Sequence, residues 1–380
     1  MHRASGRTER IIAADEARAW SLQQPHGQGI YAGCVKPLAR EDLDHILIQT
    51  VHLWNSKHGA RIFLSGGTGF FGSWLLESLA YCNHQLNLNL ATTVLSRAPE
   101  AFAARMPHLA GDPAIQLLKG DIRDFEFPEG DFDFIVHAAA STSGEDTSRP
   151  LELLGTLIKG TERMLAFAKL RSVTKLLFVS SGAVYGQQPE HLSHVPEDYL
   201  GGPNWLDPNS AYGEGKRVSE QMCSLYARET DIDAVIARCF AFVGPHLPLD
   251  RHFAIGNFIA DALAGRNIGI RGDGTPMRSY LYAADLAIWL WTLLLGATSH
   301  KVNPQVFNVG SGEAISIRDL ADEVLEVLNP SLQVKITQKP TRNAPLLQYV
   351  PDVRKAESAL GLHQTIGLRD AIRRTADWYR

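Results

Sequence analysis

Short, nearly continuous apolar runs alternate with amphipathic stretches from residue 61 onward. Runs of this kind, ending in Gly, Ser or Ala, are typical of parallel strands that are buried on both faces of a sheet. The runs that predict strands cover residues 61–65, 90–95, 115–122, 132–137, 175–179 and 231–238. The alternation predicts an α/β fold, in which a doubly wound parallel sheet of the Rossmann type binds ligands at the carboxyl ends of its strands.

Helical periodicity and the position of the runs suggest three parts of the chain. Residues 1–59 form an N-terminal extension that contains one amphipathic helix, expected over 41–54. Residues 60–240 form the Rossmann domain, with a further helix over 151–170. After residue 240 the chain has more Pro and shorter periodic segments, which favours a smaller lobe over 241–380. We expect this lobe to be mainly substrate-binding, with some segments that return to the Rossmann domain.

Composition excludes several classes of protein. The chain has 380 residues, of which 45% are hydrophobic, and a net charge of -4, which gives no reason to expect nucleic-acid binding. No apolar run reaches about 18 residues, so no membrane span is predicted. The N-terminus lacks the apolar core of a secretory signal. The four cysteines show no metal-binding spacing and indicate reduced thiols in a cytoplasmic protein without a metal site.

A glycine-rich turn follows the first predicted strand. Gly66, Gly69 and Gly72 stand at intervals of three, with Phe70 and Phe71 between the last two, and a helical pattern begins directly afterwards. Glycine permits a tight turn and lets the backbone approach a pyrophosphate, which the positive end of the following helix attracts. In this context the motif predicts a dinucleotide site, whereas the same glycines alone would indicate only a turn.

The end of the second predicted strand bears on the choice of dinucleotide. An NAD site usually has a carboxylate there to bind the ribose 2′-hydroxyl, whereas an arginine suits the 2′-phosphate of NADP. This chain has Ser96 and Arg97, and no carboxylate before Glu100. We therefore expect NADP. The alternative is that Arg97 stacks on the adenine and tolerates either cofactor.

Two further strand ends carry candidate cofactor-binding residues. Asp121 and Ile122 end the third apolar run, and the fourth is followed by three alanines, Ser141 and Thr142. Small residues allow a cofactor ring to lie against the backbone. The cofactor-binding candidates at these ends are Asp121, Ile122, Ala138, Ala139 and Ala140, and Ser141 and Thr142 are candidates for substrate binding.

Tyr212 and Lys216 are the candidate catalytic pair. They are one helical turn apart and therefore share a face of the helix expected there. The usual pKa of tyrosine, about 10, is too high for a base near neutral pH. A nearby ammonium and an oxidised nicotinamide both favour the phenolate, which would lower this pKa. The pair alone would more often be an exposed helix pair, but the glycine motif makes nicotinamide chemistry on an alcohol or ketone the better interpretation.

From about residue 60 to its C-terminus the chain resembles the extended short-chain dehydrogenases/reductases, in the nucleotide-sugar epimerase/dehydratase group. The matching motifs, besides the glycine turn and the Tyr–Lys pair, are Gly120–Ile122, His137–Ala140, Ser180–Ser181 before Val184–Gly186, Arg238 through Pro245, Arg278–Asp285, Phe307–Gly310, and Asp352 with Lys355–Ala356. The resemblance implies that Ser181 is catalytic and that Lys216 also bonds the nicotinamide ribose. It further implies that Arg278 and Arg342 hold the pyrophosphate of a sugar nucleotide. The family also suggests a homodimer that pairs helices 151–170 and 212–227.

Departures from the family pattern narrow the expected reaction. The 4,6-dehydratases that the chain resembles carry Asp and Glu where it has Gly182 and Ala183, and the sugar-acid decarboxylases carry Glu at the second of these positions. Neither residue here has a titratable group, so elimination lacks its acid and base. Ala241 stands where the family usually has an Asn that contacts the sugar. We expect reduction of a nucleotide-linked 4-keto-6-deoxy sugar at C4. Alternatives are a 4-epimerase, less readily a dehydratase or decarboxylase, and a non-enzymatic NADP-binding sensor or scaffold.

Overall fold

A computed structural model describes residues 35–139, 148–251, 253–296, 305–340 and 345–380. Residues Lys36–Arg380 form one compact unit, separate from Met1–Val35. The expected boundary near residue 240 between a Rossmann domain and a smaller lobe stays a prediction. Strand β11 lies beyond that boundary and belongs to the central sheet. None of the helices in the described residues is both long and apolar enough to cross a membrane.

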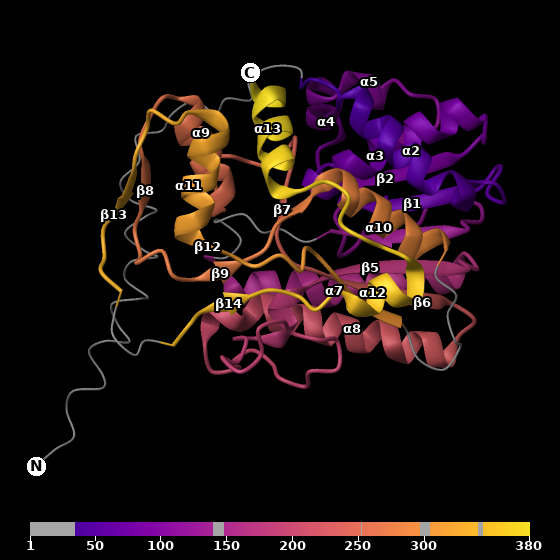
Figure 1. Ribbon diagram of the computed structural model, residues 1–380. Helices are drawn as coiled ribbons and strands as arrows, with labels where there is room; N and C mark the ends of the chain where they lie inside the picture. Colours follow the sequence, from indigo (N-terminus) through magenta and orange to yellow (C-terminus); the bar gives the residue numbers. More distant parts are fainter. Residues whose placement is uncertain (1–34, 140–147, 252, 297–304, 341–344) are drawn as a thin grey trace, which may run out of the picture. The chain divides into compact units, whose positions relative to one another are not determined.

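The centre of the molecule is a parallel sheet of seven strands in the order β11-β6-β5-β4-β1-β2-β3. Figure 1 labels β1, β2, β5 and β6 of these strands. The strands of the sheet are β1 (Arg61–Ser65), β2 (Ala91–Ser96), β3 (Ile115–Lys119), β4 (Phe134–His137), β5 (Lys175–Ser181), β6 (Asp233–Cys239) and β11 (Gln305–Val309). The first six fall on the six apolar runs, within a few residues at each end. This confirms the predicted Rossmann-type fold. The strand order reverses at β1, where such sheets bind ligands.

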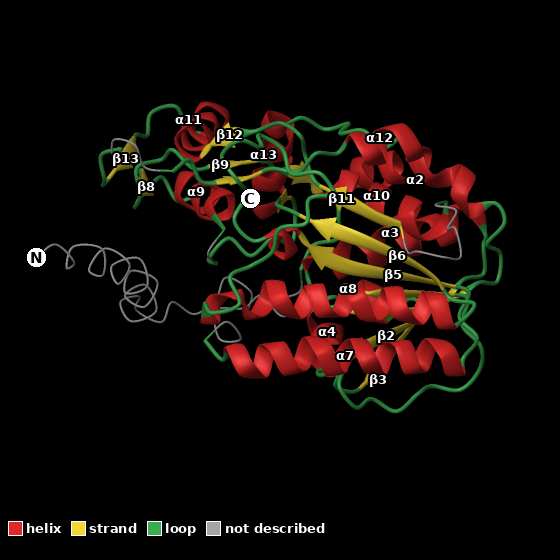
Figure 2. Cartoon of the chain, turned by 90° about the horizontal axis from the view of Figure 1, so that it is seen from below, coloured by secondary structure: helices red, strands yellow, loops and turns green. Residues whose placement is uncertain are grey.

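Alternate residues of the strands face two separate cores. In β1, Ile62 and Leu64 pack on one face of the sheet and Phe63 on the other, as the period of two in a strand requires. Helices α7 (Pro150–Leu170) and α8 (Ala211–Glu229) lie side by side over the face that Phe63 enters (Figure 2). The other face is covered by α3 (Phe70–Leu86) and α10 (Ala283–Leu295).

Helix α2 (Arg40–Trp54) comes from the N-terminal extension and packs against α10 and α3. Helix α10 needs this cover because its residues are apolar except Asp285 and Thr292, and all of them but the last are buried. The rings of Trp54 and Trp291 meet edge to face at 5.1 Å. At the other end of α2, the buried Asp42 accepts hydrogen bonds from Tyr282 (2.8 Å) and Arg374 (2.7 Å). The expected helix of the extension is therefore part of the protein's core.

The remaining elements lie outside the central sheet or connect its strands. The helices are α4 (Pro99–Arg105), α5 (Pro107–Ala110), α9 (Ala254–Leu263), α11 (Ile317–Leu328), α12 (Arg354–Leu360) and α13 (Leu368–Tyr379), with 3₁₀ turns η1 (Gly182–Tyr185) and η2 (Pro208–Ser210). The short strands are β7 (Phe242–Val243), β8 (Ile268–Ile270), β9 (Met277–Arg278), β10 (Leu281–Tyr282), β12 (Ile315–Ser316), β13 (Val334–Ile336) and β14 (Gln348–Tyr349). Of these, β12, β9 and β14 form a small sheet that brings the C-terminal part of the chain to the site described below.

Candidate active site

The glycine turn connects β1 to α3 and leaves no room for a side chain at its first and last glycines, Gly66 and Gly72. Gly66 has a φ of +79°, and a Cβ there would lie 2.5 Å from the carbonyl carbon of Ala138. A Cβ on Gly72 would lie 2.3 Å from the Cα of Gly67. Gly69 precedes α3 without a side-chain cap. The N–H groups of the first turn, which begins at Phe70, are therefore available to an anion. The cradle fits a dinucleotide pyrophosphate.

The candidates for the adenosine end of the cofactor lie at the ends of β2 and β3. Ser96 is buried, and its hydroxyl accepts a hydrogen bond from the N–H of Ala98 (3.2 Å). Arg97 is exposed and makes no hydrogen bond with another described residue. The Asp121 carboxylate is held by Arg123 through bonds of 2.8 and 3.0 Å, which lowers its pKa. Ile122 lies against α7.

The end of β4 closes the other side of the glycine turn. Ala138 donates its N–H to the Ser65 carbonyl (3.1 Å), and Ala139 donates to the Ser65 hydroxyl (3.4 Å). The predicted residues Ala140, Ser141 and Thr142 lie outside the described residues. His137 was not a predicted site residue, yet its buried ring forms hydrogen bonds with the hydroxyls of Ser65 (2.8 Å) and Thr161 (3.2 Å). Burial, with a smaller effect of Lys216, lowers the pKa of His137 to about 3, so the ring is neutral.

Ser181, Tyr212 and Lys216 come together between β5 and α8, as the sequence analysis expected of them. Ser181 is the last residue of β5, and its hydroxyl accepts the N–H of Ala183 (3.2 Å). Tyr212 is the second residue of α8 and interacts with the Ser181 hydroxyl. Lys216 lies one turn further along α8, fully buried, and donates to the carbonyl of Val179 (2.6 Å).

The electrostatics of this trio differ from the expectation. We expected the Lys216 ammonium to lower the pKa of Tyr212. Instead burial dominates and raises the pKa of Tyr212 to about 12, although the hydrogen bond from Ser181 acts in the opposite direction. Burial also lowers the pKa of Lys216 to about 8, because its charge is taken out of water. Tyr212 is therefore protonated at neutral pH, the state needed to donate a proton.

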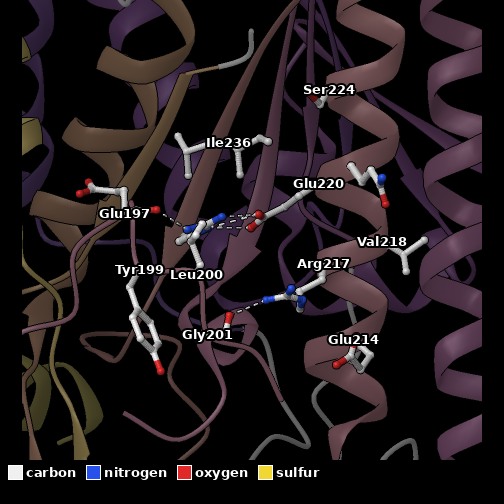
Figure 3. Close-up of a pocket in the computed structure, with 13 residues that line it drawn as sticks. Glu197, Tyr199, Leu200, Gly201, Glu214, Arg217, Val218, Glu220, Ser224 and Ile236 are labelled. Carbon is white, nitrogen blue, oxygen red and sulfur yellow. Dashed lines mark hydrogen bonds and ion pairs between the residues drawn. The ribbon is translucent and has the colours of Figure 1, made fainter. Parts of the chain in front are cut away.

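An ion pair between Glu220 and Arg238 lies next to the trio. Glu220 lies one turn beyond Lys216 on α8 and accepts hydrogen bonds from Ser180 (2.5 Å) and from Arg238 (2.7 Å). Figure 3 shows this carboxylate at the wall of an open cleft of about 720 Å³, with Arg217 and Gly201 bonded nearby. Tyr212 does not line this cleft. Glu220 was not among the predicted site residues, although its i+4 spacing from Lys216 places it on the same helix face.

The expected substrate residues are only partly described. Arg278 lies in β9, half-buried, and donates to its neighbour's carbonyl (2.8 Å). Its guanidinium is 6.0 Å from the ring centre of Tyr349. Arg342 lies outside the described residues. In the described part of the chain, no group of three or more His, Cys, Asp or Glu residues could hold a metal ion.

The fold and this trio define a class: a nicotinamide-dependent enzyme with a Rossmann fold and the Ser–Tyr–Lys site of the short-chain dehydrogenases/reductases. Residues 62–310 match the model of the NAD dependent epimerase/dehydratase family. The chain is also 32% identical over 324 residues to UDP-glucuronic acid decarboxylase 3 of Arabidopsis thaliana, which covers 84% of the chain and 90% of that relative. The chain therefore belongs to the NAD dependent epimerase/dehydratase family.

Other relatives and solved structures agree with this assignment. UDP-glucuronic acid decarboxylase 1 of Xenopus tropicalis is 28% identical and covers 87% of the chain and 74% of that relative. The dTDP-glucose 4,6-dehydratase of Streptomyces venezuelae, solved with NAD bound, has 26% identity and a TM-score of 0.69, covering 84% of this chain and 96% of that one. The structure of a UDP-N-acetylglucosamine 4-epimerase from Methanobrevibacter ruminantium has a TM-score of 0.71 and 22% identity, and the match covers 85% of this chain and 98% of that one. It shares the fold.

Proposed function

We propose that this enzyme reduces a nucleotide-linked 4-keto-6-deoxy sugar at C4, with NADPH as the electron donor. The observation that carries the proposal is the chemistry next to Ser181. Gly182 and Ala183 supply no acid or base, and a Cβ on Gly182 would lie 2.8 Å from the Phe240 ring. The proton transfers that water elimination needs at C5 and C6 have no group at these positions. Hydride transfer at a single carbonyl needs only the proton that Tyr212 holds.

The mechanism follows from the state of each side chain. The glycine turn after β1 would hold NADPH, which when bound would supply the hydride for the carbonyl carbon. Tyr212 gives its proton to the carbonyl oxygen as negative charge develops there, which its raised pKa allows because the phenol is protonated at the start. The hydroxyl of Ser181 donates a hydrogen bond to the same oxygen. Lys216, one turn beyond Tyr212 along the same helix, would bond the nicotinamide ribose.

Epimerisation at C4 is the second candidate. A UDP-galactose 4-epimerase structure, at 26% identity and a TM-score of 0.65, shares the fold over 83% of the chain. An epimerase uses the same Ser–Tyr–Lys site but returns the hydride to the sugar. Decarboxylation is the activity in the names of several relatives. The absence of a carboxylate at Ala183 weighs against that reaction here.

The test compares the two reactions directly. The enzyme should oxidise one NADPH for each molecule of a nucleotide-linked 4-keto-6-deoxy sugar that it consumes. The loss of absorbance of the reduced nicotinamide measures this oxidation. It should leave UDP-glucose and UDP-glucuronate unchanged when no reductant is added. Formation of a C4 epimer from either, with no NADPH oxidation by any keto sugar, would overturn the proposal in favour of the epimerase.

We further propose a C2 homodimer, in which α7 and α8 pack against the same helices of a second copy. Exposed apolar side chains along these helices support it: Leu151, Leu170, Val218 and Leu225. A two-fold interface uses one self-complementary patch, and C2 is the commonest closed symmetry. Leu153, Leu157, Met164 and Leu165 are already buried within the single chain and are not available to a partner. Light scattering at micromolar concentration should give twice the mass of the chain, and a monomeric mass would contradict the dimer.

A further inference from the structure

A second tyrosine reaches the catalytic trio from the C-terminal part of the chain. Tyr349 is the last residue of β14, which pairs with β9 so that Tyr349 lies beside Arg278. Its ring packs on that of Phe240, with centres 4.7 Å apart. The next residue, Val350, is fully buried and donates its N–H to Gln188 (2.9 Å). Sheet pairing, ring packing and this anchor fix where the Tyr349 hydroxyl lies.

The hydroxyl of Tyr349 lies over Gly182, next to Ser181. A Cβ on Gly182 would come within 2.8 Å of this oxygen, a distance at which one of the two would have to move. The missing side chain of Gly182 is therefore what admits the phenol. Gly182 stands where the related dehydratases have a carboxylate. In this chain the Tyr349 hydroxyl, from a distant part of the sequence, lies close to that position.

The bonding capacity of Ser181 shows what this phenol does. A hydroxyl has two lone pairs that accept and one proton that it donates. The N–H of Ala183 occupies one lone pair. Ser181 interacts with both phenols, Tyr212 and Tyr349, yet it has one proton for the two. If Tyr349 donates to the second lone pair, the proton of Ser181 has only Tyr212 or a substrate oxygen beside Tyr212 as its acceptor.

We propose that Tyr349 is a positioning residue of the reaction: its hydroxyl donates to Ser181 and thereby directs the Ser181 proton toward the substrate oxygen that Tyr212 protonates. Donation into Ser181 also makes its hydroxyl a stronger donor, because hydrogen bonds in a chain polarise one another. Burial raises the pKa of Tyr349 well above its ordinary value, so the phenol keeps the proton that this role needs. The role rests on the proposed function only in requiring a carbonyl or hydroxyl oxygen at the site.

A double-mutant cycle with Ser181 tests the proposal. Tyr349→Phe keeps the ring on Phe240 and removes only the hydroxyl. It should lower kcat roughly 10-fold, the value of about one hydrogen bond, with the KM and the Kd for NADPH unchanged. Ser181→Ala should lower kcat on the order of 10²-fold. If Tyr349 acts through Ser181, adding Tyr349→Phe to Ser181→Ala should change kcat less than about twofold.

Tyr199→Phe is the matched control, since the Tyr199 hydroxyl bonds none of the described side chains and its ring lies 6.2 Å from Tyr185. It should retain full activity. Gly182→Ala reaches the same hydroxyl from the opposite side, and should lower kcat by displacing it. The positioning role of Tyr349 would be overturned if the fold-reductions of kcat by Tyr349→Phe and Ser181→Ala multiplied in the double variant. Full activity of Tyr349→Phe alone would overturn it as well. If the wild-type enzyme epimerises instead of reducing, the proposed function fails, and the same cycle is measured on epimerisation, which also passes through Ser181 and Tyr212.

Discussion

Tyr212→Phe should lower kcat by a factor on the order of 10²–10⁴, the range that a positioned proton donor contributes. The substitution removes the phenolic proton and keeps the ring at the start of α8. Because burial raises the pKa of Tyr212 to about 12, the wild-type enzyme keeps this proton throughout the neutral range. The rate of reduction should therefore not fall through deprotonation of Tyr212 below that pH. Steady-state rates of NADPH oxidation across pH, for both proteins, measure this effect.

The control is Tyr226→Phe, on the same helix. Tyr226 is partly buried against the core under α8, away from Ser181. Tyr226→Phe should leave kcat unchanged. Both Tyr226→Phe and Tyr212→Phe should bind NADPH with wild-type affinity in a fluorescence titration. A Tyr212→Phe enzyme with most of its activity would show that some other group protonates the substrate.

Arg97→Ala should raise the KM for NADPH by roughly 10- to 100-fold, the value of a hydrogen-bonded charge pair. Arg97 is exposed at the end of β2, where the 2′-phosphate of NADP would lie. NADH lacks that phosphate, so its KM should change much less. The ratio of kcat/KM for the two cofactors, measured on the same preparation, separates this effect from general damage. Equal small effects on both cofactors would contradict the preference for NADP.

Six strands of the sheet were predictable from the sequence because each lies in one continuous apolar run, whereas β11, beyond the expected domain boundary, was not predicted. The run at 61–65 became β1 with the same ends, and the glycines behind it formed the expected close turn. The pairing of Tyr212 with Lys216 was predictable for a similar reason, since one helical turn separates them. Ser181 was identified through the family resemblance, and the structure brings it to the same place.

Properties that depend on packing between distant segments were not predictable. The pKa of Tyr212 moved in the direction opposite to our expectation because burial outweighs its polar neighbours, and burial is not encoded in local spacing. Tyr349 reaches Gly182 only through the small sheet of β12, β9 and β14. Nothing in the residues around Tyr349 marks it as part of the site.

The packing of α2 on α10 has a practical consequence for work on this enzyme. The family match begins at residue 62, which invites a shortened recombinant protein that starts there. Such a protein would lose Trp54 from the side of Trp291, and would leave Tyr282 and Arg374 without the carboxylate of Asp42. It would then expose to water the face of the largely apolar α10 that packs against α2, a surface prone to aggregation. For this chain, the minimal catalytic unit is longer than the conserved domain that identifies it.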